Sequence, residues 1–551
     1  MTMNMNVKKY IISGLTLALF TAAGFAQEAA PAPEESQIAL PDLTTVVSGS
    51  AQQEDIAPAP DFDDVLELPL NSGDLVPLLP AASADGETDL VNASNDPMQK
   101  DIYAEGAIGG GYPASFTGDF EISRLYGADP FKISFAHESA SGFAGHDLAQ
   151  GYNQSSTLIG VEKDFIRSKI RWGLAARYED LGNGLQSCAE GISAYNQDAI
   201  GLSANILWTL PKNLKLSFTA GSEFYYRFSN LSKDSSQAAA IPDWIINTSR
   251  LTADPELRLA WNYKGFELAF DAAYNLEALE GLSNRGLFKL DFAWQNEKIK
   301  LYADAGIVIG NMIGDNKVIP PFTVGLETNL PVYFSDRQLN LVLCGGLDSQ
   351  RQTSAQLERS FKFSGLDQLP SETSDWYGKT SLLVPLKTSF TGTVAAGFYH
   401  TAFGNGVWVP AYNTQNPVAN CLYTYEQKTR NELFTDFAFT WKYKLFAATA
   451  KYHANWLENP ALENKHTISV NFALQSQKGL WGTSLDTAYL LDAQDNKPVI
   501  NLEGYLQVSS AVRIVLSVND MIKLLGAEGR TYAGQYISNS GNALLLVKFL
   551  F

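Results

Sequence analysis

The feature that most constrains the fold is a two-residue alternation of apolar and polar side chains, which recurs from residue 101 to the end of the chain. In one segment, Phe266, Leu268 and Phe270 alternate with Glu267 and Asp271. This period predicts β-strands with one apolar and one polar face. Charged residues persist on the polar faces, which suits a water-filled lumen better than the dry core of a soluble β-sandwich or propeller. The pattern therefore predicts an all-β protein, a transmembrane antiparallel β-barrel.

The connections between these expected strands alternate between short and long, as in barrels of the outer membrane. Short connections are expected near 166–168, 210–212, 263–265, 295–297, 384–387, 442–444 and 509–511. Long connections are expected near 138–152, 181–193, 229–248, 348–374, 400–422 and 521–541. Counting strands with this parity predicts about 22, within a range of about 18 to 24.

The last residues read as a closing barrel strand. Val547, Phe549 and Phe551 fall on one face, and Lys548 lies on the other. The machinery that assembles barrels in the outer membrane reads a terminal aromatic strand of this kind. We therefore expect these three residues to be a C-terminal assembly signal, with the barrel-assembly machinery and outer-membrane lipid as partners.

The first residues read as a signal peptide. Lys8 and Lys9 precede an apolar run over 10–23, and small residues before position 27 predict cleavage after Ala26. No later stretch contains about 18 uninterrupted apolar residues, so no transmembrane helix is expected. Residues 1–26 are thus assigned to the signal peptide, and the chain to the bacterial outer membrane.

Residues 27–100 form an acidic segment that differs in composition from the rest. Residues 27–99 contain 15 Asp or Glu, no Lys or Arg, and nine Pro, and they account for most of the net charge of −19. Such a segment buries too little apolar area to offset the entropy lost on ordering. We expect a disordered periplasmic tail over 27–100, a barrel over 101–551, and no nucleic acid as a partner.

The barrel region resembles that of TonB-dependent outer-membrane receptors, which have 22 strands. The resemblance rests on the closing segment, where an Asn519-Asp520 strand end and a Gly529-Arg530 turn precede an aromatic C-terminal strand. In the tail, the following residues are similar to the box that those receptors offer to TonB by strand addition: Leu43, Thr44, Thr45, Val46, Val47, Ser48 and Gly49. The resemblance implies TonB, or another periplasmic protein, as a partner of the tail.

The chain departs from that family in front of the barrel. The receptors carry a folded plug domain of well over a hundred residues, whereas here the acidic tail alone precedes the barrel. We therefore expect the plug to be absent. A barrel of this width would leave a large pore, so we expect the tail, inward-folding long connections or a separate partner to obstruct it.

No motif for catalysis or for metal binding is found. The five His show no metal-ligand spacing, and no nucleophile elbow or phosphate loop is present. We expect no enzyme activity, no catalytic residues, no metal and no cofactor. The candidate lumen-facing residues carry both signs of charge, which argues against strong ion selectivity: Lys215, Glu223, Arg227, Asp271, Lys289, Asp291, Asp304 and Arg513.

Three functions fit this sequence. The first is transport of a solute or nutrient through a plugless relative of the TonB-dependent receptors. The second is porin-like diffusion through a channel narrowed by its loops. The third is adhesion or binding at the cell surface by long outer loops, with the barrel as a scaffold.

Overall fold

A computed structural model describes residues 102–550 of the chain, apart from internal gaps. The gaps are 125–128, 188–191, 232–246, 279–280, 314–317, 335–336, 361–362, 366–368, 388, 412–423, 458–459, 461–464, 492–496 and 533–535. The predicted signal peptide, acidic tail and TonB-like box therefore lie outside the described residues and stay predictions.

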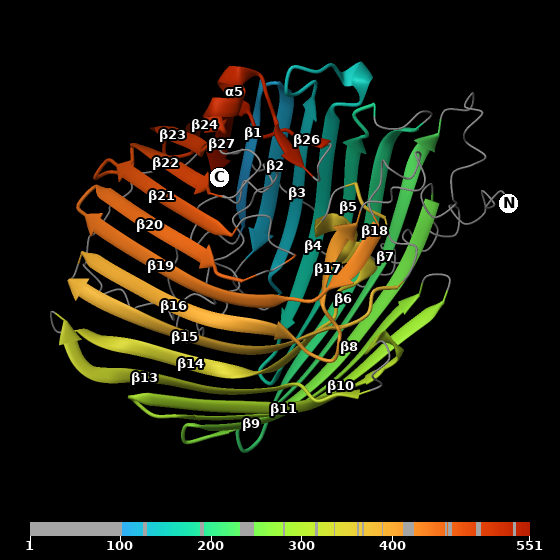
Figure 1. The fold of residues 1–551 in the computed structure, drawn as a ribbon, viewed down its shortest axis with the longest axis vertical. Helices are drawn as coiled ribbons and strands as arrows, with labels where there is room; N and C mark the ends of the chain where they lie inside the picture. The colour runs from blue at the N-terminus through green and yellow to red at the C-terminus, as the bar shows by residue number, and fades with distance from the viewer. Residues whose placement is uncertain are drawn as a thin grey trace, which may run out of the picture. The chain divides into compact units, whose positions relative to one another are not determined.

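The described chain is almost entirely β-strand (Figure 1). The strands of the large sheet are β1 (Tyr103–Tyr112), β2 (Ala114–Arg124), β3 (Phe131–Ser141), β4 (Asn153–Ile166), β5 (Ile170–Gly184), β6 (Ile192–Leu210), β7 (Leu214–Leu231), β8 (Asn247–Tyr263), β9 (Phe266–Ala278), β10 (Leu282–Gln295), β11 (Ile299–Gly310), β12 (Val318–Ile319), β13 (Phe322–Phe334), β14 (Arg337–Gln350), β15 (Thr373–Lys387), β16 (Phe390–Thr401), β19 (Asn431–Tyr443), β20 (Phe446–Asn455), β21 (His466–Gln475), β22 (Trp481–Leu490), β23 (Val499–Ser509), β24 (Val512–Asn519) and β27 (Asn542–Leu550). The connections hold the two short hairpins β17 (Val407–Ala411) with β18 (Thr424–Lys428) and β25 (Arg530–Tyr532) with β26 (Tyr536–Ser538), the helices α4 (Ser354–Ser360) and α5 (Met521–Gly526), and the 3-10 turns η1 (Leu148–Gln150) and η3 (Asn311–Ile313).

The large sheet closes on itself as an antiparallel barrel of 22 strands. The two-residue strand β12 does not count separately, because it pairs with β11 just ahead of β13 and is parted from β13 by Pro320 and Pro321, which cannot donate to the ladder. At the seam, the first strand β1 pairs with the last strand β27, with Gly106 opposite Phe549. The predicted fold class and the strand number of 22 are confirmed.

The alternation places apolar side chains on the outer face of the strands. On β9 and β10, for example, Phe266, Leu268, Phe288 and Leu290 are each 44–58% exposed. Such a belt of exposed large apolar side chains is strongly unfavourable in water and is typical of barrels that span the outer membrane. Among the described residues, no helix is long and apolar enough to cross a membrane.

The connections fall into the two predicted classes. The end of the barrel where β1 starts and β27 finishes has short turns, such as Lys264-Gly265 between β8 and β9, where both residues have positive φ. Gly265 is required there, because a Cβ would run into the carbonyl of Gln295. The opposite end, here called the long-loop end, carries most of the long connections, including 142–152, 351–372, 402–430 and 520–541.

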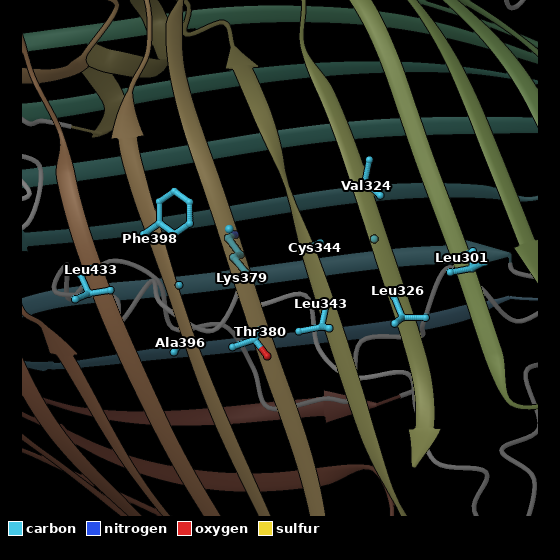
Figure 2. Close-up of a pocket in the computed structure, with 13 residues that line it drawn as sticks. Leu301, Val324, Leu326, Leu343, Cys344, Lys379, Thr380, Ala396, Phe398 and Leu433 are labelled. Carbon is cyan, nitrogen blue, oxygen red and sulfur yellow. The ribbon is translucent and has the colours of Figure 1, made fainter. Parts of the chain in front are cut away.

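The outer face also has an apolar hollow of about 590 Å³ over β11 to β19. Figure 2 shows Val324, Leu343, Phe398 and Leu433 among its lining residues. Small residues at its floor, such as Ala396, leave the space that a larger side chain would fill. The hollow therefore lies on the outer face and does not belong to the interior of the barrel.

An apolar cluster lies on the interior face beside the seam. There Val515 of β24 and Leu544 and Leu546 of β27 are buried against one another, with Tyr505 packed on them. The expectation of a charged inner face along the whole chain is therefore wrong at this place. The closing strands are held by apolar packing on the inside as well as by their ladder.

Candidate functional site

Three connections of the long-loop end contact one another, and together they form what we call the inner cap. They are 351–372, which contains α4, 402–430, which contains the hairpin β17–β18, and 520–541, which contains α5 and β25–β26. In Figure 1, β17 and β18 are seen within the ring of barrel strands. The inner cap is the most densely built polar site of the described chain and is the candidate functional site.

The helix α4 starts at a capping box. Thr353 and Gln356 bond reciprocally: the Thr353 hydroxyl accepts from the Gln356 amide at 3.1 Å, and the Gln356 side chain accepts from the Thr353 amide at 2.9 Å. These bonds satisfy two amides that a helix start leaves without partners. A Thr-x-x-Gln spacing is thus the sequence signal for α4.

Glu358 of α4 is the centre of a buried polar cluster. Its Oε1 lies 2.8 Å from Arg227 Nη1 on β7 and 2.6 Å from Arg250 Nη1 on β8. Its Oε2 accepts a hydrogen bond of 2.5 Å from the hydroxyl of Tyr225. Glu358 and Arg227 are 0% exposed, and Arg250 and Tyr225 are 1% exposed. A carboxylate buried so completely is tolerable only because cations and a hydroxyl donor surround it.

Two further arginines tie the same connection to the barrel wall. Arg359 lies 3.0 Å from Glu179 on β5 and 3.1 Å from Glu223 on β7. Arg351 forms an ion pair with Asp254 on β8. The amide of Ser354, at the start of α4, donates a 3.0 Å hydrogen bond to a carboxylate oxygen of Glu277 on β9.

These contacts mean that the connection 351–372 crosses the interior of the barrel. It leaves from β14 and returns to β15, yet its partners lie on β5 to β9. Side chains alternate between the two faces along β7, and Phe224 is 36% exposed on the outer face. Tyr225 and Arg227 therefore lie on the interior face. The expectation that a long connection folds inward is therefore confirmed for 351–372.

The other two connections of the inner cap pack on the first. The hydroxyl of Tyr425 on β18 donates to the carbonyl of Leu357 at 2.6 Å, and Leu357, Trp408 and Tyr425 form an apolar cluster. Phe363 stacks on Tyr536 with ring centroids 3.7 Å apart. The inner cap is thus a packed unit of three connections.

Glu372 anchors the end of the first connection at β15. It is 1% exposed, and both carboxylate oxygens accept from Nε of Arg285 on β10, at 2.8 and 2.9 Å. Ser349 donates to the same carboxylate at 2.6 Å. The connection is therefore fixed by buried ion pairs at both of its ends, Glu358 and Glu372.

The predicted lumen residues separate into three groups in the structure. Glu223 and Arg227 contact the inner cap. A second group lies in one network on β8 to β11: Arg258 Nη1 is 2.6 Å from both Asp271 and Asp291, and Lys289 is 3.1 Å from Asp291 and 3.9 Å from Asp304. Lys215, near the short-turn end of β7, and Arg513, which donates to Gln507 at 2.7 Å, join neither group.

Sequence reasoning missed the residues that hold the inner cap, chiefly Glu358, Arg250 and Tyr225. Trp408 is 7% exposed within the inner cap. The nearby Tyr412 and Tyr423 lie outside the described residues, as does Phe551 of the predicted assembly signal. Phe549 and Val547 of that signal lie on β27 at the seam.

Metal chemistry finds no support in the described part of the chain. No group of three or more His, Cys, Asp or Glu is close enough there to hold a metal ion. The His residues make other contacts: His453 lies 2.6 Å from Asp436, and His146 stacks on Tyr152.

The comparisons with known proteins agree with the fold. No protein-family model matches the sequence, and no curated protein does. Solved structures match over most of their length. The FrpB iron transporter from Neisseria meningitidis matches at 8% identity and a TM-score of 0.59, covering 82% of this chain and 83% of that one.

Two other matches are similar in extent. The copper transporter OprC matches at 10% identity and a TM-score of 0.60, covering 82% and 80% of the two chains. The siderophore receptor PirA from Acinetobacter baumannii matches at 8% and 0.59, covering 83% and 81%. The chain therefore has the 22-strand barrel fold of the TonB-dependent outer-membrane receptors that its sequence resembles.

Proposed function

We propose that the protein is a transport barrel of the bacterial outer membrane in which the inner cap takes the place of a plug. The long-loop end faces the cell surface, and the tail over 27–100 extends into the periplasm. Solute or nutrient passage then depends on displacing the connection 351–372 from the interior of the barrel.

The observation that carries this proposal is the buried attachment of Glu358 to Arg227 and Arg250 on the far wall. A connection that served as a surface adhesin would extend outward from the barrel, whereas this one is bound inside it. The matched structures named above are transporters and a receptor by their descriptions, which favours transport over adhesion.

The buried ion pairs that hold the inner cap in place also determine what is needed to open it. A buried ion pair resists displacement, since separating its charges inside the barrel leaves both without partners. Opening therefore requires work from a ligand or from a periplasmic partner. We propose that residues 43–49 of the tail supply a TonB contact by strand addition.

Conductance in planar bilayers tests the role of the inner cap. We expect a small conductance for the full chain and a several-fold larger one for a variant in which 352–371 is replaced by a short Gly-Ser linker. Equal conductance of the two would overturn the proposal: if both were large, the porin-like alternative would hold, and if both were small, the obstruction would lie elsewhere.

A second experiment tests the periplasmic partner. The isolated tail should retain TonB in a pull-down, and a tail with residues 43–49 scrambled should not. Equal recovery with both tails would remove the TonB contact from the proposal. Growth of a deletion strain on defined nutrients separates uptake from adhesion, because loss of an adhesin leaves growth unchanged.

A further inference from the structure

Two short turns of the barrel share one local sequence and one geometry. The chain reads Trp-Asn-Tyr-Lys-Gly-Phe over 261–266, between β8 and β9, and Trp-Lys-Tyr-Lys-Leu-Phe over 441–446, between β19 and β20. In each turn the Trp and Tyr rings stack, with centroids 5.8 Å apart in the first and 6.3 Å apart in the second. The ammonium group of the following Lys lies over the Tyr ring, 5.2 Å and 5.3 Å from its centroid. We call these two segments the Trp-Tyr-Lys turns.

The rings of the Trp-Tyr-Lys turns lie on the outer face of the barrel. Tyr263 and Tyr443 are 47% and 54% exposed, and they continue the alternation that places Trp261 and Phe439 in the outer apolar belt. Exposed rings at the ends of barrel strands form an aromatic girdle where a membrane meets water. The lysine cations beyond the rings therefore lie at the level of lipid headgroups.

The geometry of the turns does not explain why they contain lysine. Lys264 and Lys444 have φ angles of 48° and 50°. Gly, Asn and Asp are favoured in this left-handed region, and a Lys there costs free energy. Both lysines are exposed, and neither forms an ion pair with any carboxylate in the part of the chain that the structure describes. Each turn therefore presents a positive charge that no described acidic residue neutralises.

Other short turns extend this positive charge into a rim. The turns β4–β5, β6–β7, β8–β9, β10–β11, β19–β20 and β21–β22 contain one acidic residue, Glu297, and these exposed basic residues: Arg167, Lys169, Lys212, Lys264, Lys298, Lys444 and Lys478. Backbone hydrogen bonds join three neighbouring turns, because the amide of Asn262 donates to Asn213 at 3.1 Å and that of Gln295 donates to Gly265 at 2.8 Å. We call the seven basic residues the basic rim.

The cations of the inner cap differ from those of the basic rim because they are already paired. In the described parts of its three connections, these Lys and Arg residues all form ion pairs with carboxylates: Arg351, Arg359, Lys428, Arg430, Lys523 and Arg530. In the basic rim, Arg167 alone has such a partner among the described residues, namely Asp129. The basic rim is therefore suited to an anion from outside the folded barrel.

We propose that the basic rim binds the anionic headgroups of phospholipids in the adjoining leaflet, with the Trp-Tyr-Lys turns as the main contacts. The headgroup phosphate supplies the missing negative charge, and the acyl chains continue over the rings and the outer apolar belt. A lysine can cover an aromatic ring with its methylene stem while its cation reaches the headgroup. An acidic peptide would neutralise the lysines but leave the rings uncovered. The inference rests on the proposed placement of the barrel in a membrane and not on the inner cap.

The lipid selectivity of the reconstituted full chain tests the inference. Electron spin resonance of spin-labelled lipids in phosphatidylcholine vesicles measures the fraction of each labelled lipid that the protein immobilises. We expect phosphatidylglycerol to be favoured about two- to fivefold over phosphatidylcholine, the range expected for one Lys beside an anionic charge. The preference should fall toward unity in about 1 M NaCl, where the screening length is about 3 Å.

Two double variants of equal charge locate the contact. Lys264→Gln with Lys444→Gln should lower the preference by about half or more, whereas replacing the same two lysines by Arg should preserve it. The control, Lys465→Gln with Lys497→Gln, removes the same charge from exposed lysines of two long connections and should also preserve it. An unchanged preference in the Lys264→Gln, Lys444→Gln protein would overturn the inference.

Two further outcomes would also count against it. If phosphatidylglycerol were favoured only after residues 27–100 had been deleted, the acidic segment and not lipid would be the occupant of the basic rim. If both lipids were immobilised equally, the inference would fail while the transport proposal stood. If neither lipid were immobilised, the barrel would not lie in the bilayer, and both proposals would fail together.

Discussion

Replacing Glu358 by Gln isolates the buried charge on which the inner cap depends. The change keeps the size of the side chain but removes the negative charge that pairs with the guanidinium groups of Arg227 and Arg250, which are 0% and 1% exposed. Removing one partner of a buried ion pair costs about 3–5 kcal/mol. Because the barrel ladder does not pass through α4, the loss falls on docking of the cap and not on the barrel.

That free energy corresponds to a roughly 150- to 5,000-fold lower ratio of docked to undocked cap. Hydrogen exchange of the amides in 354–360 measures this ratio, and we expect exchange there to accelerate while exchange in β7 and β8 is unchanged. The conductance should rise toward that of the variant without 352–371.

Glu528→Gln is the matched control for this prediction. Glu528 also lies in a long connection and also contacts two cations, Lys497 at 2.7 Å and Lys523 at 3.3 Å, but half of its side chain is exposed. Exposed pairs contribute little, so this variant should leave exchange in 354–360 unchanged. Unaltered exchange in the Glu358→Gln protein would refute the reasoning. Replacing Glu358, Arg227 and Arg250 together by apolar residues should restore much of the docking.

Four further outcomes are expected. Gly365→Ala should accelerate exchange of 354–360, because a Cβ would run into the guanidinium of Arg227, whereas Gly281→Ala, with nothing within 4 Å, should not. Arg285→Met should lower the melting temperature measured by circular dichroism, since Glu372 is left buried and unpaired at a cost of about 3–5 kcal/mol. Thr353→Ala should weaken cap docking by about 1 kcal/mol in the same exchange assay, through loss of the capping box. Lys497 and Lys523 lower the pKa of Glu528, so the small stabilisation by this exposed pair is present above the ordinary Glu pKa and is lost as the pH falls through the lowered value. The protection of 520–530, corrected for the intrinsic pH dependence of amide exchange, should fall slightly there, and an identical profile in Glu528→Gln would contradict this.

The barrel could be predicted from the sequence because the pattern that specifies it lies within each strand and each turn. Each strand is identified by its own alternation, and each connection is identified as short or long by its own length. The strands can therefore be counted to an even number of about 22 without knowledge of long-range contacts. The predicted short turn at 263–265 lies at Lys264 and Gly265, and the predicted long connection at 348–374 lies at 351–372.

The inner cap could not be predicted because the contacts that hold it join residues that are far apart in the sequence. Nothing near Glu358 in the sequence indicates that its partners are Arg227 and Arg250, and the ladder order alone does not say which way a connection folds. The capping box at Thr353 and Gln356 predicts the start of α4 but does not indicate which strands the helix packs against. The apolar interior cluster beside the seam was also missed, although Leu544 and Leu546 pack on Val515 and Tyr505 of the two preceding strands of the large sheet.

The pairing of β1 with β27 has a consequence for biogenesis. Strand β1 has one ladder partner, β2, nearby in sequence, but its other partner, β27, is synthesised after all the other strands of the large sheet. Until then both ends of the sheet present unpaired amides and carbonyls that would pair with any other strand. These unpaired edges must therefore be kept from other strands until β27 has been made and has paired. A truncation that removes β27 should leave an open-edged sheet prone to aggregation, and not a smaller barrel.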